Sequence, residues 1–175
     1  MSQRLTISAI ALILFLSSCT NSKEKKLMGK WVAIAMESPR LEQEIKEAQR
    51  FIDTVGSHTT PDENMALYGV RDMDSLRTLL KEQMELTLVE QKRLIDSTWL
   101  DFLKGGIIAS NFGAPQPDTI NWYLDDEGDL ILDEMKMKGS GDKVRMEITT
   151  LTNDTLRLRF NENGYSSTAT FVRKK

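Results

Sequence analysis

Near its carboxyl end the chain reads Leu156-Arg157-Leu158-Arg159-Phe160, and this run decides the fold class. Apolar and charged side chains alternate along it, so one face suits a core and the other suits water. A period of two is typical of a strand in an antiparallel sheet that is buried on one face. A similar alternation, of apolar with more polar side chains, occurs in Ile120–Leu124 and in Val144–Thr149. The last third of the chain is therefore expected to form a β-sheet.

Turn residues and further strands extend this pattern. The runs are separated by short turns suited to hairpins: Asp126-Glu127-Gly128, Gly139-Ser140-Gly141, Asn153-Asp154 and Glu162-Asn163-Gly164. Other strands are expected at Trp31–Met36, Thr98–Leu103, Ile107–Asn111 and Ser166–Arg173. We expect an antiparallel meander of eight strands, seven of them consecutive, and the runs named above delimit seven of the eight. Closure of such a meander into a barrel removes exposed edges and leaves an interior for side chains or one small ligand.

The section Glu37–Ser97 has a helical pattern instead. Apolar residues recur every three or four positions in two stretches, which predicts one helix over Leu41–Val55 and another from about Met73 to Ile95. A short helix between them begins with a capping box at Thr60-Pro61-Asp62-Glu63 and ends at Gly69. The predicted fold is thus mainly β with a helical insertion (α+β): an eight-stranded closed or partly open barrel, with two longer helices inserted between strands 1 and 2.

The apolar stripes of the two long helices need to be covered. They can pack on each other, on an open end of the barrel, or on a partner protein. Because both ends of the insertion join neighbouring strands, we expect a cap over one barrel mouth. In that arrangement Leu76, Leu80 and Met84 point toward the sheet.

Composition limits the classes of function. The 23 basic and 26 acidic residues give a net charge of -3, which argues against nucleic-acid binding. A single Cys excludes a disulfide framework, and a single His excludes most zinc sites and His-based triads. His58 lies in a polar loop, and the acidic segment Asp125–Asp129 fits a hairpin tip better than a calcium loop. We therefore expect no catalytic residues, no metal or cofactor, and no enzymatic activity.

The first nineteen residues resemble the signal peptide of a bacterial lipoprotein. Arg4 precedes the apolar run Ile7–Leu16, and Leu16-Ser17-Ser18-Cys19 is similar to a lipobox. In that family the Cys becomes the first mature residue and carries acyl chains such as palmitate, so the resemblance implies membrane attachment through Cys19. An ordinary signal peptide and a signal anchor are the alternatives. Thr20 rather than Asp follows the Cys, which in enteric bacteria directs lipoproteins to the outer membrane.

These features give a domain plan. Residues 1–18 are the expected signal peptide, residues 19–26 a lipidated polar tether, and residues 27–175 a single domain with the helical insertion at about residues 37–97. The expected location is the cell envelope.

The motif Gly29-Lys30-Trp31 resembles the G-x-W opening of lipocalins. In that family the Trp closes the floor of the barrel under an Arg at the end of the last strand, and Arg173 occupies the matching position. The chain also resembles small lipocalin-like bacterial lipoproteins. It departs from the family by its helical insertion and by the lack of a second lipocalin motif. The resemblance implies contact between Trp31 and Arg173.

Two functional hypotheses remain. In the first, the barrel binds a small apolar or amphipathic molecule between the walls Trp122, Met146, Ile148, Leu158 and Phe160. In the second, these side chains fill the interior, and the acidic insertion, with 13 acidic and 8 basic residues, binds another envelope protein. Large inward side chains usually pack together, which favours a filled interior. An apolar cavity of a few hundred Å³ would favour ligand binding.

Overall fold

A computed structural model describes residues 22–162 and 164–174 of the chain. The expected signal peptide and Cys19 lie outside the described residues. The chain divides into two compact units. We call described residues 22–37 and 95–174 the barrel unit and residues 38–94 the helical unit, and each is described by itself.

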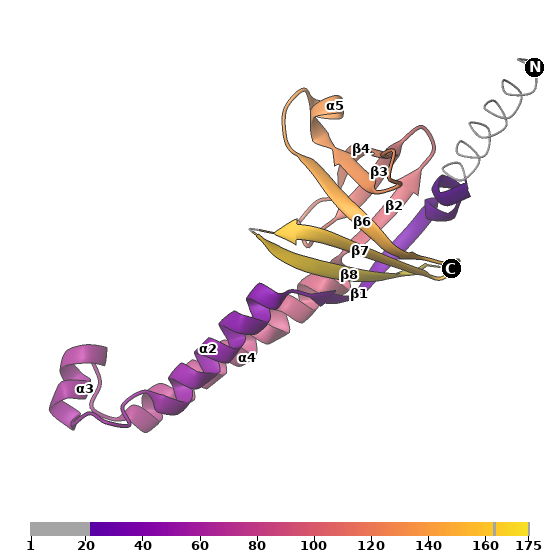
Figure 1. Ribbon diagram of the computed structural model, residues 1–175. Coiled ribbons are helices and arrows are strands. Elements are labelled where there is room, and N and C mark those ends of the chain that lie inside the picture. The colour runs from indigo at the N-terminus through magenta and orange to yellow at the C-terminus, as the bar shows by residue number, and fades with distance from the viewer. Residues whose placement is uncertain (1–21, 163, 175) are drawn as a thin grey trace, which may run out of the picture. The chain divides into compact units, whose positions relative to one another are not determined.

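Eight strands of the barrel unit form a closed antiparallel barrel (Figure 1). Each strand pairs with its neighbours in the sequence, and β1 also pairs with β8, which closes the sheet. The strands are β1 (Gly29–Glu37), β2 (Trp99–Leu103), β3 (Ile107–Asn111), β4 (Asp118–Leu124), β5 (Leu130–Asp133), β6 (Lys143–Leu151), β7 (Thr155–Glu162) and β8 (Tyr165–Arg173). The predicted eight-stranded meander with a helical insertion between strands 1 and 2 is confirmed, and the barrel is closed.

The alternation seen in the sequence separates the inside of the barrel from the outside. Leu156 and Leu158 of β7 are almost fully buried. Between and beyond them, Arg157 and Arg159 form ion pairs on the outer surface with Glu37 of β1 and Glu147 of β6. The inward residues of all eight strands join in one apolar core.

Two irregularities in the strand pairing change which side chains face inward. In β1 the register with β8 shifts between Ala33 and Ala35, so that Met36 pairs with the buried Ala169. A similar shift in β6 lies between Ile148 and Thr150. Such bulges insert a residue and re-aim the side chains that follow. In β1 the bulge brings Met36, rather than Ala35, into register with an inward position.

A short helix that we did not expect follows β5. In α5 (Glu134–Lys138) the carboxylate of Asp133 accepts a hydrogen bond from the backbone N–H of Lys136, and Gly139 ends the helix in a left-handed conformation. The stretch expected to be a hairpin turn, residues 139–141, is therefore the exit of a helix. The segments before and after it still pair as β5 and β6.

The helical unit contains α2 (Pro39–Thr54), α3 (Pro61–Tyr68) and most of α4 (Met73–Ser97). The capping box at Thr60 is present, and Gly69 ends α3 in a left-handed conformation, as predicted. In Figure 1 α2 and α4 lie side by side. Leu80 and Met84 of α4 line a groove together with Ile45 and Ala48 of α2. These two α4 residues, which we expected to point toward the sheet, border a groove between two helices of the same unit.

The polar stretch before β1 has regular structure. Residues 22–27 form a helix, although residues 22–26 were expected to belong to a polar tether, and the backbone N–H of Met28 donates to the carbonyl of Glu24. Among the described residues, no helix is both long enough and apolar enough to cross a membrane.

Candidate functional site

The strand order distinguishes two ends of the barrel. Because neighbouring strands are antiparallel, the start of β1 and the end of β8 lie at one end, together with the β2–β3, β4–β5 and β6–β7 turns. We call this the Trp31 end. The end of β1, the start of β2 and the end of β7 lie at the other, which we call the cavity end. The chain leaves the barrel for the helical unit, and returns from it, at the cavity end.

Two side chains close the Trp31 end. Trp31 is fully buried, and the guanidinium carbon of Arg173 lies 4.2 Å from the centroid of its ring. The indole N–H of Trp31 donates to the carbonyl of Leu27, at 2.7 Å. The guanidinium of Arg173 donates to the carbonyls of Lys26, Met28 and Asn153. The predicted contact between Trp31 and Arg173 is confirmed.

This arrangement explains why a helix precedes β1. The last carbonyls of a helix have no partner within the helix, and a buried carbonyl without a partner is costly. Trp31 and Arg173 supply donors to the three consecutive carbonyls at the end of the helix over residues 22–27. A cationic side chain at a helix C-terminus also interacts favourably with the helix dipole.

Gly29 meets two requirements of the same site. Its φ angle is +102°, in the region that side chains with a Cβ rarely adopt. A Cβ built at this position would lie 3.1 Å from Nη1 of Arg173. The G-x-W spacing therefore has a physical reason here: the glycine admits the arginine, and the arginine covers the tryptophan.

The cavity end contains an apolar cavity of about 320 Å³. It is lined by side chains from β1, β2, β6, β7 and β8 and from the segment after β3. These are Met36, Thr98, Leu100, Phe112, Val144, Met146, Leu158, Phe160, Asn161, Ala169 and Phe171. A volume of this size corresponds to about ten water molecules in the liquid.

Of the five predicted wall residues, three line the cavity and two do not. Met146, Leu158 and Phe160 line the cavity. Trp122 belongs to the apolar core and Ile148 packs against that core, but neither lines the cavity. Trp122 instead packs edge-on against Phe102, with ring centroids 5.0 Å apart, and its indole N–H donates to the carbonyl of Ile107.

Sequence reasoning missed several lining residues. Met36 was not identified because the bulge in β1 changes the alternation that the sequence suggests. Phe112 was missed because it follows the last residue of β3, Asn111. Leu100 and Phe171 lie in predicted strands, but they were not among the five residues predicted to line the cavity.

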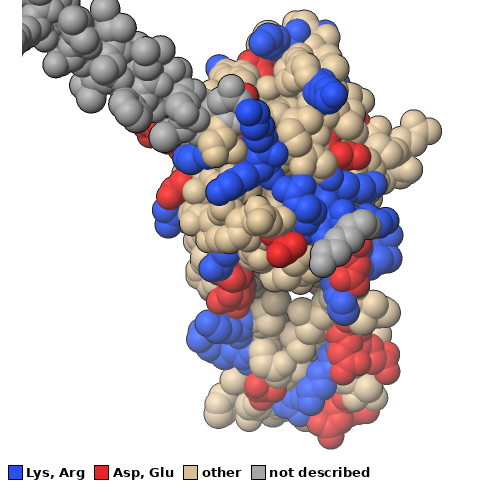
Figure 2. All heavy atoms as spheres, turned by 90° about the vertical axis from the view of Figure 1, so that its right-hand side faces the viewer, with Lys and Arg blue, Asp and Glu red and all other residues tan. Residues whose placement is uncertain are grey.

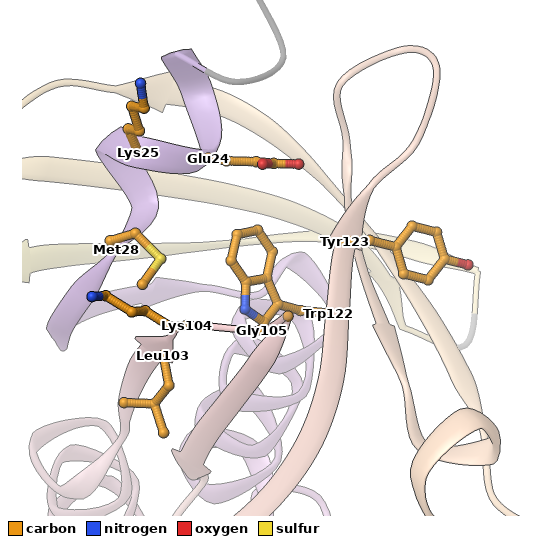
Figure 3. Close-up of a pocket in the computed structure, with 9 residues that line it drawn as sticks. Glu24, Lys25, Met28, Leu103, Lys104, Gly105, Trp122 and Tyr123 are labelled. Carbon is orange, nitrogen blue, oxygen red and sulfur yellow. The ribbon is translucent and has the colours of Figure 1, made fainter.

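The Trp31 end has a second hollow of different character. A groove of about 460 Å³ lies between the helix over residues 22–27, the β2–β3 turn and β4. Figure 3 shows Met28, Leu103 and Trp122 beside the charged side chains of Lys25 and Lys104. Figure 2, turned toward the side where both described ends of the chain lie, shows Lys and Arg side chains gathered among uncharged ones.

The acidic segment 125–129 is a turn, as predicted. Asp125 accepts hydrogen bonds from the backbone N–H groups of Glu127 and Asp129 within the β4–β5 connection. The bond from Asp129, together with the positive charge of Arg145, lowers the pKa of Asp125. Arg145 also pairs with Glu127 and Asp129. Local hydrogen bonds and one arginine thus occupy these carboxylates.

Other reactive groups are dispersed. His58 is exposed in the loop after α2. Within the described part of the chain, no group of three or more His, Cys, Asp or Glu side chains is placed to hold a metal ion. The cavity has an uncharged, mostly apolar lining, so its chemistry is burial of apolar surface.

Comparisons with models of protein families, with curated proteins and with solved structures find no match to this chain.

Proposed function

We propose that this protein is a non-enzymatic lipoprotein of the cell envelope whose lipocalin-like barrel binds a small apolar or amphipathic molecule. The observation that carries the proposal is the apolar cavity of about 320 Å³ at the cavity end. Small-molecule sites are typically concave, mostly apolar and upwards of about 300 Å³. The cavity meets these requirements at the lower limit, so the ligand is small.

The division of the barrel interior supports this reading. Toward the Trp31 end the interior is filled by Trp31, Phe102 and Trp122. Toward the cavity end, Met146 and Phe160 border space instead of another side chain. A barrel with one blocked end and one hollow end has the form of a cup. The lipocalin-like part of the proposal rests on this form and on the G-x-W motif under Arg173.

Ligand binding is tested directly with a neutral fluorescent probe, N-phenyl-1-naphthylamine. The chain from Thr20 onward is suitable because it contains every residue of both described units. We expect Ala169→Phe, which places a ring at a lining position, to weaken probe binding at least tenfold. Ala109→Phe is the matched control, because Ala109 lies on β3 but does not line the cavity. Equal binding by both variants, or no binding by the parent, would contradict the proposal.

Membrane attachment through acylated Cys19 is the second part of the proposal. Two residues separate Cys19 from Ser22, the first described residue, and a chain of this length spans about 10 Å at most. An acyl anchor would thus hold the Trp31 end near the bilayer, where Lys23, Lys25 and Lys26 favour anionic headgroups. Cys19→Ala is expected to release the protein from membranes or to leave its precursor uncleaved. An unchanged mature mass with unchanged membrane fractionation would refute acylation.

One observation favours a second candidate function, the binding of an envelope protein by the helical unit. Three apolar side chains of α4 are more than half exposed and lie on a side of the helix away from the Leu80–Met84 stripe: Leu79, Leu86 and Val89. Exposed apolar patches often mark interaction sites. Loss of a co-purifying protein in Leu86→Ser, with probe binding intact, would support this function.

A further inference from the structure

We propose that the cavity selects uncharged amphipathic ligands, with an apolar chain and one neutral hydrogen-bonding head such as a hydroxyl, and rejects carboxylate and phosphate heads. This inference rests on the proposed function, because it specifies the ligand class of the same cavity. It follows from which polar groups border the cavity and from where the nearest cations are held.

None of the described residues that line the cavity carries a charge. The arginines of β6 and β7 are held on the outer surface by carboxylates. Arg157 pairs with Glu37, Arg159 with Glu147, and Arg145 with three acidic residues of the β4–β5 turn. The alternation of β6 and β7 directs these arginines outward because their neighbours Met146, Leu158 and Phe160 face inward. An anionic head inside the cavity would therefore find no counter-charge among the described side chains.

Neutral polar groups are present instead. Thr98 and Asn161 line the cavity, and each carries both a donor and an acceptor. Either residue can therefore bond to a neutral head such as a hydroxyl.

The absence of a counter-charge has a measurable consequence. An ionised group that enters an apolar site without a partner loses its hydration, and it enters in its neutral form instead. A fatty acid would therefore bind as the protonated acid. Its apparent affinity would fall about tenfold for each pH unit above the pKa of its carboxyl, which is about 4.3 for a simple side-chain carboxyl. An alcohol of the same chain length would show no such dependence.

The test compares two ligands that differ only in the head. The chain from Thr20 onward is loaded with N-phenyl-1-naphthylamine, and the probe is displaced by decan-1-ol or by decanoate at pH 8. We expect decan-1-ol to displace the probe and decanoate to be at least 100-fold weaker. If decan-1-ol and decanoate bind with affinities within tenfold of each other, the proposed selectivity is wrong, although the cavity would still bind ligands. Failure of the probe itself to bind would overturn the proposed function and this inference with it.

Three variants test the residues invoked. Met36 lines the cavity and is 39% exposed, so an arginine there keeps its head partly in water. Met36→Arg is expected to raise the affinity for decanoate at pH 8 at least tenfold without improving decan-1-ol. Asn161→Leu should weaken decan-1-ol threefold to tenfold, whereas Ser166→Ala, at the exposed register partner of Asn161 on β8, should not. If Met36→Arg folds and gains no affinity for decanoate, or if Asn161→Leu binds decan-1-ol as the parent does, the proposal is wrong.

Discussion

The guanidinium of Arg173 covers the indole ring of Trp31, at 4.2 Å from the guanidinium carbon to the ring centroid, and joins the last strand of the barrel to the first. The two residues are register partners in the pairing of β1 with β8, the pairing that closes the sheet. Together they also bind the carbonyls at the end of the helix over residues 22–27. One pair of side chains therefore links barrel closure to the segment that leads toward the expected anchor.

Replacement of Arg173 by Met is expected to lower the free energy of unfolding by about 2 kcal/mol or more. The variant loses the stacking on Trp31, and it leaves the carbonyls of Lys26, Met28 and Asn153 without their donor. Urea unfolding followed by tryptophan fluorescence measures the loss. Lys174→Met, at the exposed neighbouring position, is the control. Equal stability of the two variants would show that Arg173 is dispensable for closure.

Gly29→Ala is expected to destabilise the barrel more than Gly105→Ala. Both glycines have positive φ angles, so both substitutions incur backbone strain of about 1 kcal/mol. A Cβ at position 29 also crowds Nη1 of Arg173 at 3.1 Å, whereas nothing lies within 4 Å of a Cβ at position 105. The difference in unfolding free energy between the two variants therefore isolates the crowding. No difference would mean that Arg173 moves aside without cost.

Much of the barrel can be predicted from the sequence because its strands are buried on one face. The alternating residues Leu156–Phe160 fix which side chains face inward, and the turns between the runs indicate antiparallel neighbours. β5 was not delimited because Leu130, Ile131 and Leu132 are all buried, so no alternation marks them. α5 is only five residues long and is specified by its caps, Asp133 and Gly139, rather than by periodicity.

The cavity was harder to predict than the fold. The alternation of apolar and polar residues along a strand identifies the side chains that face inward. It does not show where those side chains leave part of the barrel interior unfilled. Trp122 and Met146 have the same inward pattern in the sequence, yet one fills the core and the other borders the cavity. The bulge in β1 depends on its pairing with β8, and Met36 lies 133 residues before its partner Ala169 (169 − 36), so the inward placement of Met36 had no local signal.

The stability of the β4–β5 turn is expected to depend on pH through Asp125. Hydrogen bonds from the turn lower the pKa of this carboxyl in the folded state, so the folded state binds fewer protons than the unfolded state. The stabilisation is complete above the unfolded value of about 3.9, and it is lost as the pH falls through the lower folded value. Urea unfolding of the parent and of Asp125→Asn between pH 7 and pH 2 measures this. We expect the difference in free energy of unfolding between the parent and Asp125→Asn to become smaller as the pH falls. A difference that stays constant with pH would show that Asp125 is not the group responsible.

The final prediction separates the two apolar surfaces of α4. Leu80 is partly buried and lines the groove with α2, whereas Leu86 is 69% exposed. Leu80→Asp places an unpaired charge where the two helices pack, and it should destabilise the helical unit by about 2 kcal/mol or more. Leu86→Asp should lower the free energy of unfolding by about 0.5 kcal/mol or less, because its side chain is already in water.

Hydrogen exchange of backbone amides in α2 distinguishes the two variants. Exchange should accelerate in Leu80→Asp and stay unchanged in Leu86→Asp. Acceleration in both variants would show that Leu86 is covered in solution, as a docked partner or a second copy of the chain would cover it.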